Sequence, residues 1–161
     1  MLMRRYTLLT LLSVTAVVSG GCVTIESGDS DVAALKALHE NVLEFHRQGN
    51  VDAWMAQEAD NVVSANRGTI SFTSAEERRA RREPYLSSTS FDVYRDLRPP
   101  VIRVSDDGTL GWVIAEVEMK GSAVSDDGER VPFEAIWAWI ELYEKQGGAW
   151  KAVGNVSNRR P

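Results

Sequence analysis

The chain is poor in the residues from which metal, redox and disulfide sites are usually built. Its 161 residues include one cysteine and two histidines. One cysteine cannot form a disulfide within the chain, so a packed apolar core must stabilise the fold. The sequence also has no glycine-rich phosphate loop, no nucleophilic-serine motif and no cysteine and histidine spacing typical of a metal site. These absences predict a protein without a metal or a cofactor.

Basic residues are also fewer than acidic ones. The chain has 18 lysines and arginines against 23 aspartates and glutamates, which gives a net charge of −5. Residues 1–21 contain two of the arginines and none of the acids, so the rest of the chain is more acidic still. Nucleic acids and anionic membrane surfaces attract positively charged proteins. We therefore expect no nucleic-acid partner.

Long apolar runs are absent except at the start of the chain, from Tyr6 to Val18. This run is too short for a transmembrane helix, which needs roughly 20 apolar residues. Two arginines precede it and Ser19-Gly20-Gly21-Cys22 follows it, which is the order of a secretory signal. The small residues before Cys22 resemble the lipobox of bacterial lipoproteins, whose cysteine is acylated after cleavage. Ser19 stands where that motif usually has leucine, so an ordinary secretory cleavage that leaves Cys22 free remains an alternative.

This leader divides the chain into three parts. We expect a signal peptide over residues 1–21, a lipidated Cys22 with a flexible tether over residues 22–30, and one domain over residues 31–161. The tether is predicted from small polar residues without periodicity. The expected location is the bacterial cell envelope, with the domain held to the membrane through the lipid on Cys22.

Three helices are predicted in the first half of the domain. The first runs from Asp31 to Gly49, because apolar side chains recur at three-and-four spacing: Leu35, Leu38, Val42 and Phe45. Asn50 is a suitable cap for a second, short helix. Ser74-Ala75-Glu76-Glu77 matches a capping box that begins a third helix, which Pro84 is expected to end or kink. The arginines between residues 78 and 82 are expected to form a solvated face.

From Ser87 onward the pattern is that of an antiparallel sheet. Two Ser-Asp-Asp-Gly turns, at residues 105–108 and 125–128, and a Gly-Gly turn at residues 147–148 separate longer strands. The strand expected from Val131 to Glu144 is apolar on both faces at its middle. One face can cover the helices, so the other face needs another cover.

Three helices with a short strand pair, followed by long antiparallel strands, resemble the nuclear transport factor 2-like superfamily. The ending, with Ala138 to Lys145, a glycine turn and Trp150 to Val153, looks like its SnoaL-like branch. The resemblance implies an α+β, cone-shaped fold, with three N-terminal helices packed on a curved, mainly antiparallel sheet around an apolar pocket. It also implies a homodimer formed through the outer sheet face. Members include ketosteroid isomerase, cyclases, dehydratases and non-catalytic binding or assembly domains.

Candidate catalytic residues are few. His39 and His46 fall on the core side of the first helix, where a histidine either forms a structural hydrogen bond or acts as a base or donor in a pocket. By resemblance, Glu58 and Asp60 lie where ketosteroid isomerase has its general base. A second catalytic group is missing, because Asn155 occupies a region that is often titratable in SnoaL-like proteins and can only hold a ligand by hydrogen bonds.

Aromatic residues favour a binding site over a catalytic one. The candidate ligand-binding residues are Trp54, Tyr85, Tyr94, Trp112, Glu116, Trp137 and Asn155. Aromatic side chains with polar tips are typical of small-molecule pockets, although core packing is the alternative. Glu116 alternates with Trp112 and Ile114, so it is expected to point inward with them.

Three functions therefore remain after the sequence is read. The leading hypothesis is an envelope lipoprotein whose domain binds a small apolar or amphipathic ligand, or a protein partner, without catalysis. The first alternative is an isomerase, cyclase or dehydratase that uses Asp60 or Glu58 with His39. The second alternative is a structural dimerisation module.

Overall fold

The computed structural model describes residues 27–161. The predicted leader, Cys22 and the first part of the predicted tether lie outside these residues. The helices are α1 (Ser27–Gln48), α2 (Val51–Ala56) and α3 (Ala75–Ser88). The strands are β1 (Glu58–Asn66), β2 (Thr69–Ser74), β3 (Thr89–Asp96), β4 (Val101–Val104), β5 (Leu110–Val124), β6 (Arg130–Gln146) and β7 (Ala149–Arg159).

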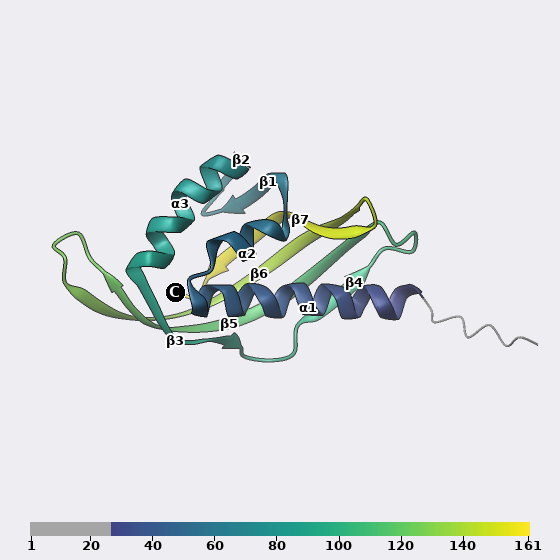
Figure 1. Ribbon diagram of the computed structural model, residues 1–161. Helices are drawn as coiled ribbons and strands as arrows, with labels where there is room; N and C mark the ends of the chain where they lie inside the picture. Colours follow the sequence, from purple (N-terminus) through teal and green to yellow (C-terminus); the bar gives the residue numbers. More distant parts are fainter. Residues whose placement is uncertain (1–26) are drawn as a thin grey trace, which may run out of the picture.

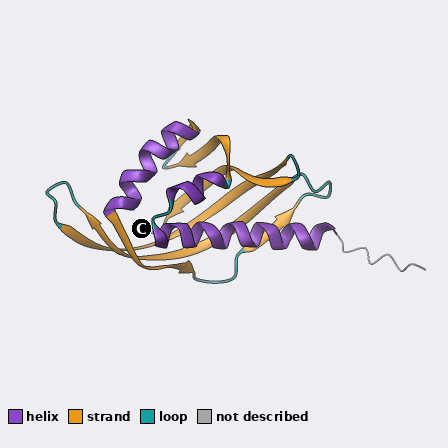
Figure 2. Ribbon diagram, in the orientation of Figure 1, coloured by secondary structure: helices purple, strands orange, loops and turns teal. Residues whose placement is uncertain are grey.

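One curved sheet carries all three helices on the same face (Figures 1 and 2). Its strand order is β2-β1-β7-β6-β5-β3, with β4 pairing the other end of β5. Every neighbouring pair is antiparallel except β1 and β7. The predicted α+β fold, with helices packed on a curved and mainly antiparallel sheet, is confirmed. None of the helices within residues 27–161 is long and apolar enough to cross a membrane.

Helix α1 begins earlier than its apolar spacing predicts. Its first turn, Ser27 to Ser30, falls inside the segment that the sequence predicts as a flexible tether. Asp29 stands in that turn, where a negative charge favours the helix dipole. Asp31 is then fixed to the sheet, because its carboxylate accepts hydrogen bonds from Lys145 Nζ at 2.6 Å and Trp150 Nε1 at 2.9 Å. The end of the sheet therefore holds the start of the helix.

The other two helices begin at the predicted caps. The Asn50 side chain accepts a hydrogen bond from Ala53 N, and Ser74 forms the capping box with Glu77. Pro84 does not end α3, which continues to Ser88. A proline removes one helical hydrogen bond, but Leu86, which is buried in the following turn, keeps the helix on the domain.

The core consists of two apolar clusters under α1. Leu35 packs with Val113, Tyr143 and Trp150 in one cluster. The other cluster contains Leu43, Tyr94, Ala115, Val117 and Met119. His39 lies between Leu35 and Leu43 on the same side of α1, so a polar side chain separates the two clusters.

Candidate functional site

A buried network of charged residues surrounds His39, whose side chain has no exposed surface. His39 Nδ1 lies 3.0 Å from Glu141 Oε2, and Nε2 lies 3.0 Å from Asp96 Oδ1. Glu141 also accepts hydrogen bonds from Trp139 Nε1 at 3.0 Å and from the Tyr143 hydroxyl at 2.9 Å. The network connects α1, the end of β3 and the inner face of β6.

The two carboxylates keep His39 protonated. Burial alone would lower its pKa, but the hydrogen bonds to Asp96 and Glu141, with their negative charges, raise the pKa to about 10. Both ring nitrogens therefore donate to carboxylates at neutral pH. An imidazolium held in this way cannot take up a proton, so His39 is not placed to act as a general base.

The sequence reading identified one member of this network and missed its partners. Glu141 follows Trp137 and Trp139 at alternating positions of β6, so an acid stands among aromatic residues on the inner face. That alternation was a signal for a buried acid that needs a partner. No comparable signal marks Asp96, which is the last residue of β3.

A second cluster of aromatic rings surrounds His46. Its ring is stacked on Tyr94 with centroids 4.5 Å apart, and Trp54 lies 4.1 Å away. Tyr85 and Phe91 pack edge-on against it at 6.3 and 6.1 Å. The candidates Trp54, Tyr85 and Tyr94 are thus brought together, and Trp137 packs against the neighbouring core cluster. Ring contacts occupy the place where the sequence predicts an open apolar pocket.

His46 has the opposite electrostatic character to His39. Burial, with a smaller effect from the Arg82 charge, lowers its pKa to about 4, although its hydrogen bond to Val42 O opposes the shift. The ring is therefore neutral at pH 7, with the Nδ1 proton donated to Val42 O at 2.7 Å. The guanidinium of Arg82 lies over the Trp54 ring at 3.6 Å, in a cation–π contact.

Glu58 is the centre of an ion-pair network that fixes α3 to β1. Its carboxylate accepts hydrogen bonds from Arg78 Nε at 2.8 Å and from both terminal nitrogens of Arg82 at 2.6 Å. Arg78 also donates to the backbone carbonyls of Ala59, Asp60 and Thr73. The expectation of a solvated arginine face is wrong for Arg78 and Arg82, which are 1% and 8% exposed. The reason is that Glu58 and three carbonyls lie within their reach.

The proposed catalytic residues are not brought together. The Glu58 carboxylate is occupied by two arginines, and the polar hydrogens of His39 are donated to Asp96 and Glu141. Asp60 is exposed. Within residues 27–161, no three histidine, cysteine, aspartate or glutamate side chains are grouped in a way that could hold a metal ion.

Glu116 and Trp112 lie on the outer face of the sheet, not inside it. Their neighbours Val113, Ala115 and Val117 are the buried residues of β5, so the expectation that Glu116 points inward is wrong. The strand has the predicted alternation but the opposite orientation. Glu116 forms ion pairs with Arg98 and Arg160 at 2.5 and 2.6 Å, so its negative charge is balanced on the outer face. Asn155 is on β7 beside Glu141, and its amide lies 3.4 Å from Ile140 O.

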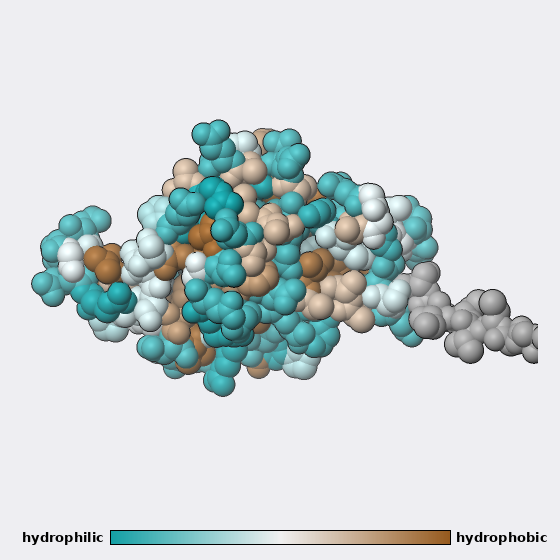
Figure 3. Space-filling model, in the orientation of Figure 1, coloured by the Kyte–Doolittle hydropathy of each residue, from teal (hydrophilic) through white to brown (hydrophobic). Residues whose placement is uncertain are grey.

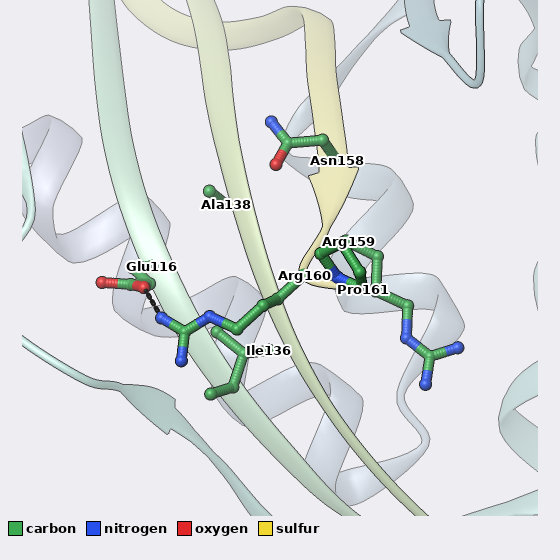
Figure 4. Close-up of a pocket in the computed structure, with 7 residues that line it drawn as sticks. All are labelled: Glu116, Ile136, Ala138, Asn158, Arg159, Arg160 and Pro161. Atoms are coloured by element: carbon green, nitrogen blue, oxygen red, sulfur yellow. Dashed lines mark hydrogen bonds and ion pairs between the residues drawn. The ribbon is translucent and has the colours of Figure 1, made fainter.

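Two cavities stand out among the described residues, and neither lies between α1 and the sheet. One, of about 210 Å³, is on the outer face and is lined by Glu116, Ile136, Ala138, Asn158, Arg159, Arg160 and Pro161 (Figure 4). Figure 4 shows Arg160 extending across it to Glu116. The other, of about 510 Å³, lies between α2 and α3 and is lined by Asp52, Met55, Ala56, Ala75, Glu76 and Arg79. Only Glu116 belongs to the predicted ligand-binding set.

Beside the first cavity, the outer face carries two rows of mostly apolar residues. The strand registers align one row of six residues across the sheet: Ile70, Ala65, Val156, Ile140, Ile114 and Val101. The parallel row contains Phe72, Val63, Gly154, Leu142, Trp112 and Arg103. Phe72 and Ile70 are 80% and 66% exposed. We call these two rows the outer apolar surface; the helical side shown in Figure 3 is mostly hydrophilic.

Comparison with known proteins identifies the fold. No protein-family model matches the sequence, and no curated protein matches it. A ketosteroid isomerase-like protein from Erwinia carotovora atroseptica superposes with a TM-score of 0.65 at 16% identity, over 83% of this chain and 98% of that one. A provisionally assigned dehydratase of the nuclear transport factor 2-like family from Streptomyces avermitilis gives 0.65 at 11% identity, over 83% and 99%. A provisionally assigned calcium/calmodulin-dependent kinase II association domain from Exiguobacterium sibiricum gives 0.63 at 16% identity, over 80% and 92%. This chain therefore has the nuclear transport factor 2-like fold.

Proposed function

We propose that this chain is an envelope lipoprotein of the SnoaL-like type whose domain binds a protein partner without catalysis, and that the partner is a second copy of the chain. The outer apolar surface carries the proposal. Large exposed apolar patches mark interaction sites, because the free energy falls when a partner removes apolar surface from water. A twofold interface uses the same patch on both copies, which suits a surface built of two similar rows. One structural neighbour is described as an association domain, which agrees with assembly.

The dimer is tested by placing a charge in the middle of the outer apolar surface. Ile114 lies near the centre of its row and is 41% exposed, so Ile114→Glu should leave the fold intact while separating the copies. Val32→Glu is the matched control, since Val32 is 37% exposed on α1. Sedimentation of the full chain in mild detergent should show an associated species for the parent and the control and a smaller species for Ile114→Glu. A parent that is monomeric at tens of micromolar contradicts the proposal.

A small amphipathic ligand at the cluster around His46 is a second candidate function. The cluster combines a neutral imidazole, a cation–π pair and the partly exposed ring of Tyr85, 37% exposed, at its edge. Binding of the amphipathic dye anilinonaphthalene sulfonate should weaken in Trp54→Phe and remain unchanged in Val32→Ala, which alters an exposed apolar side chain of α1 outside the cluster and outside the outer apolar surface. Equal binding by both variants would remove this candidate.

The membrane anchor is tested separately. If Cys22 is acylated, cells fed labelled palmitate should produce a labelled protein, and Cys22→Ser should abolish the label. An unlabelled but exported parent would favour ordinary secretory cleavage instead. Neither result alters the dimer test.

A further inference from the structure

Strand β2 is an unprotected edge of the sheet. Within residues 27–161 it pairs only with β1, at the end of the strand order and at the margin of the sheet in Figure 1. An edge strand presents unpaired backbone N–H and C=O groups that can pair with another chain. The sequence of β2, Thr-Ile-Ser-Phe-Thr-Ser, contains no charge, proline or glycine.

The opposite edge differs. Strand β3 carries Asp92 and Arg95 and has an irregularity in its register between Phe91 and Val93. Strand β4, which forms the rest of that edge, is only four residues long and carries Arg103. Charges and bulges are devices that keep edge strands from pairing. The register of β2 with β1 is continuous from Ser74 to Thr69. The molecule therefore blocks pairing at one edge and leaves it open at the other.

We propose that β2 pairs in antiparallel orientation with β2 of a second copy, with the two Ser71 residues opposite each other on a twofold axis. In this register Ile70 of each copy lies opposite Phe72 of the other, so each apolar residue of β2 meets an apolar residue. Cross-strand pairs of an aromatic and a β-branched residue stabilise a sheet. Registers centred on Ile70 or Phe72 would instead place an apolar side chain opposite Gly68 or Ser74.

The same register joins the outer apolar surfaces of the two copies. The row that ends at Ile70 continues into the row that begins at Phe72 of the second copy, and the reverse holds for the other row. Pairing at the edge would therefore join the outer apolar surfaces of the two copies into one continuous surface of twice the size. This interface is separate from the face-to-face dimer proposed above and does not depend on it.

Unpaired charges at the two ends of β2 become partners in this arrangement. Arg67 precedes the strand and Glu76 follows it; both are exposed, and neither has an ion-pair partner among residues 27–161. The register places Gly68 of one copy opposite Ser74 of the other, so the turn that carries Arg67 lies beside the start of α3, which carries Glu76, twice. Such pairs add specificity more than affinity.

Cross-linking tests the register directly. The full chain carries Cys22→Ser, so that an introduced thiol is the only one, and Ile114→Glu, so that face-to-face contact is disrupted. Directly opposed residues bring their Cβ atoms within about 5 Å, close to the range of a disulfide. Ser71→Cys should therefore form a covalent dimer on mild oxidation by copper phenanthroline. Ser64→Cys, which stands one strand inward beside Ser71, is the control and should give at least tenfold less dimer.

A charge exchange tests the ends of the strand in the same background. Arg67→Glu should weaken association about tenfold in sedimentation, and adding Glu76→Arg should restore it. Equal cross-linking of Ser71→Cys and Ser64→Cys, or of neither, would overturn the edge proposal. An unchanged mass for Ile114→Glu bears only on the face-to-face dimer, so the two proposals fail separately.

Discussion

The two faces of this sheet differ in which side chains they bury and which they expose. The inner face, under α1, buries charge: His39, Asp96 and Glu141 form a network in which each has a partner. The outer face exposes apolar side chains such as Phe72 and Ile70. Buried charges are tolerated only when paired, and exposed apolar surface of this extent is normally covered. The inner face is therefore complete in one copy, whereas the outer face leaves apolar side chains exposed for the partner proposed above.

The largest effect should come from breaking the inner network at its centre. His39→Leu keeps a side chain of similar volume but leaves two carboxylates buried without their cation. We expect a loss of about 3–5 kcal/mol in the free energy of unfolding, measured by urea denaturation. Adding Glu141→Gln should recover part of the loss, because it removes one of the uncompensated charges. A loss below about 1 kcal/mol would mean that the network contributes little.

The contribution of His39 should also depend on pH. Its pKa is raised to about 10 in the folded chain from an ordinary value of 6.5. The folded state therefore binds this proton more tightly, so the stabilisation is complete below pH 6.5 and is lost as the pH rises through 10. The advantage of the parent over His39→Leu should shrink accordingly between pH 7 and pH 10.

A second pair of substitutions compares a buried and an exposed arginine of α3. Arg78→Met leaves three backbone carbonyls and part of Glu58 without a donor, and we expect a loss of about 3 kcal/mol. Arg81→Met is the control, since Arg81 is exposed on the same helix, and it should change stability by less than about 0.5 kcal/mol. Similar losses in the two variants would show that helix propensity, not the network, is being measured.

His46 gives a pH dependence of the opposite sign. Its pKa is lowered to about 4 in the folded chain from 6.5, so the unfolded chain takes up the proton first as the pH falls. The stabilisation is present above pH 6.5 and is lost between there and pH 4. His46→Phe should remove roughly 2 kcal/mol of the stability change between pH 7 and pH 4.5. Parallel pH profiles for parent and variant would contradict a neutral, buried His46.

The sequence predicts the fold because local signals agree with it. The apolar spacing around Leu35, the cap at Asn50 and the capping box at Ser74 each identify a helix that is present. The Ser-Asp-Asp-Gly segments are turns between antiparallel strands, as predicted. These features depend only on residues close together in the chain, which is why a single sequence contains them.

The candidate site could be predicted less completely from the sequence, because it depends on strand register and on partners that are distant in the chain. Glu116 alternates as predicted, but alternation cannot say which face meets α1, and a shift of one residue exchanges the faces. The sequence predicts a solvated Arg78 because its partner Glu58 lies on another element. Asp96 meets His39 across 57 residues of sequence, a contact that no local pattern indicates.

The smallest effects are expected when the same substitution is made once on each face of the sheet. Val113 has no exposed surface on the inner face, whereas Val101 is 47% exposed on the outer face. Replacing either with threonine exchanges a methyl group for a hydroxyl. Val113→Thr should lose about 1–3 kcal/mol of unfolding free energy because the hydroxyl is buried, whereas Val101→Thr should change it by less than about 0.5 kcal/mol.

The measurement has to be made in dilute protein, where copies are separate. Under that condition the outer apolar surface contributes nothing to the stability of one copy, so Val101 is free to become polar. At high concentration the same substitution should begin to lower the unfolding midpoint, because a surface covered by a partner acquires the properties of a core. An equal loss for both variants in dilute protein would mean that the outer face is already part of the core of one copy.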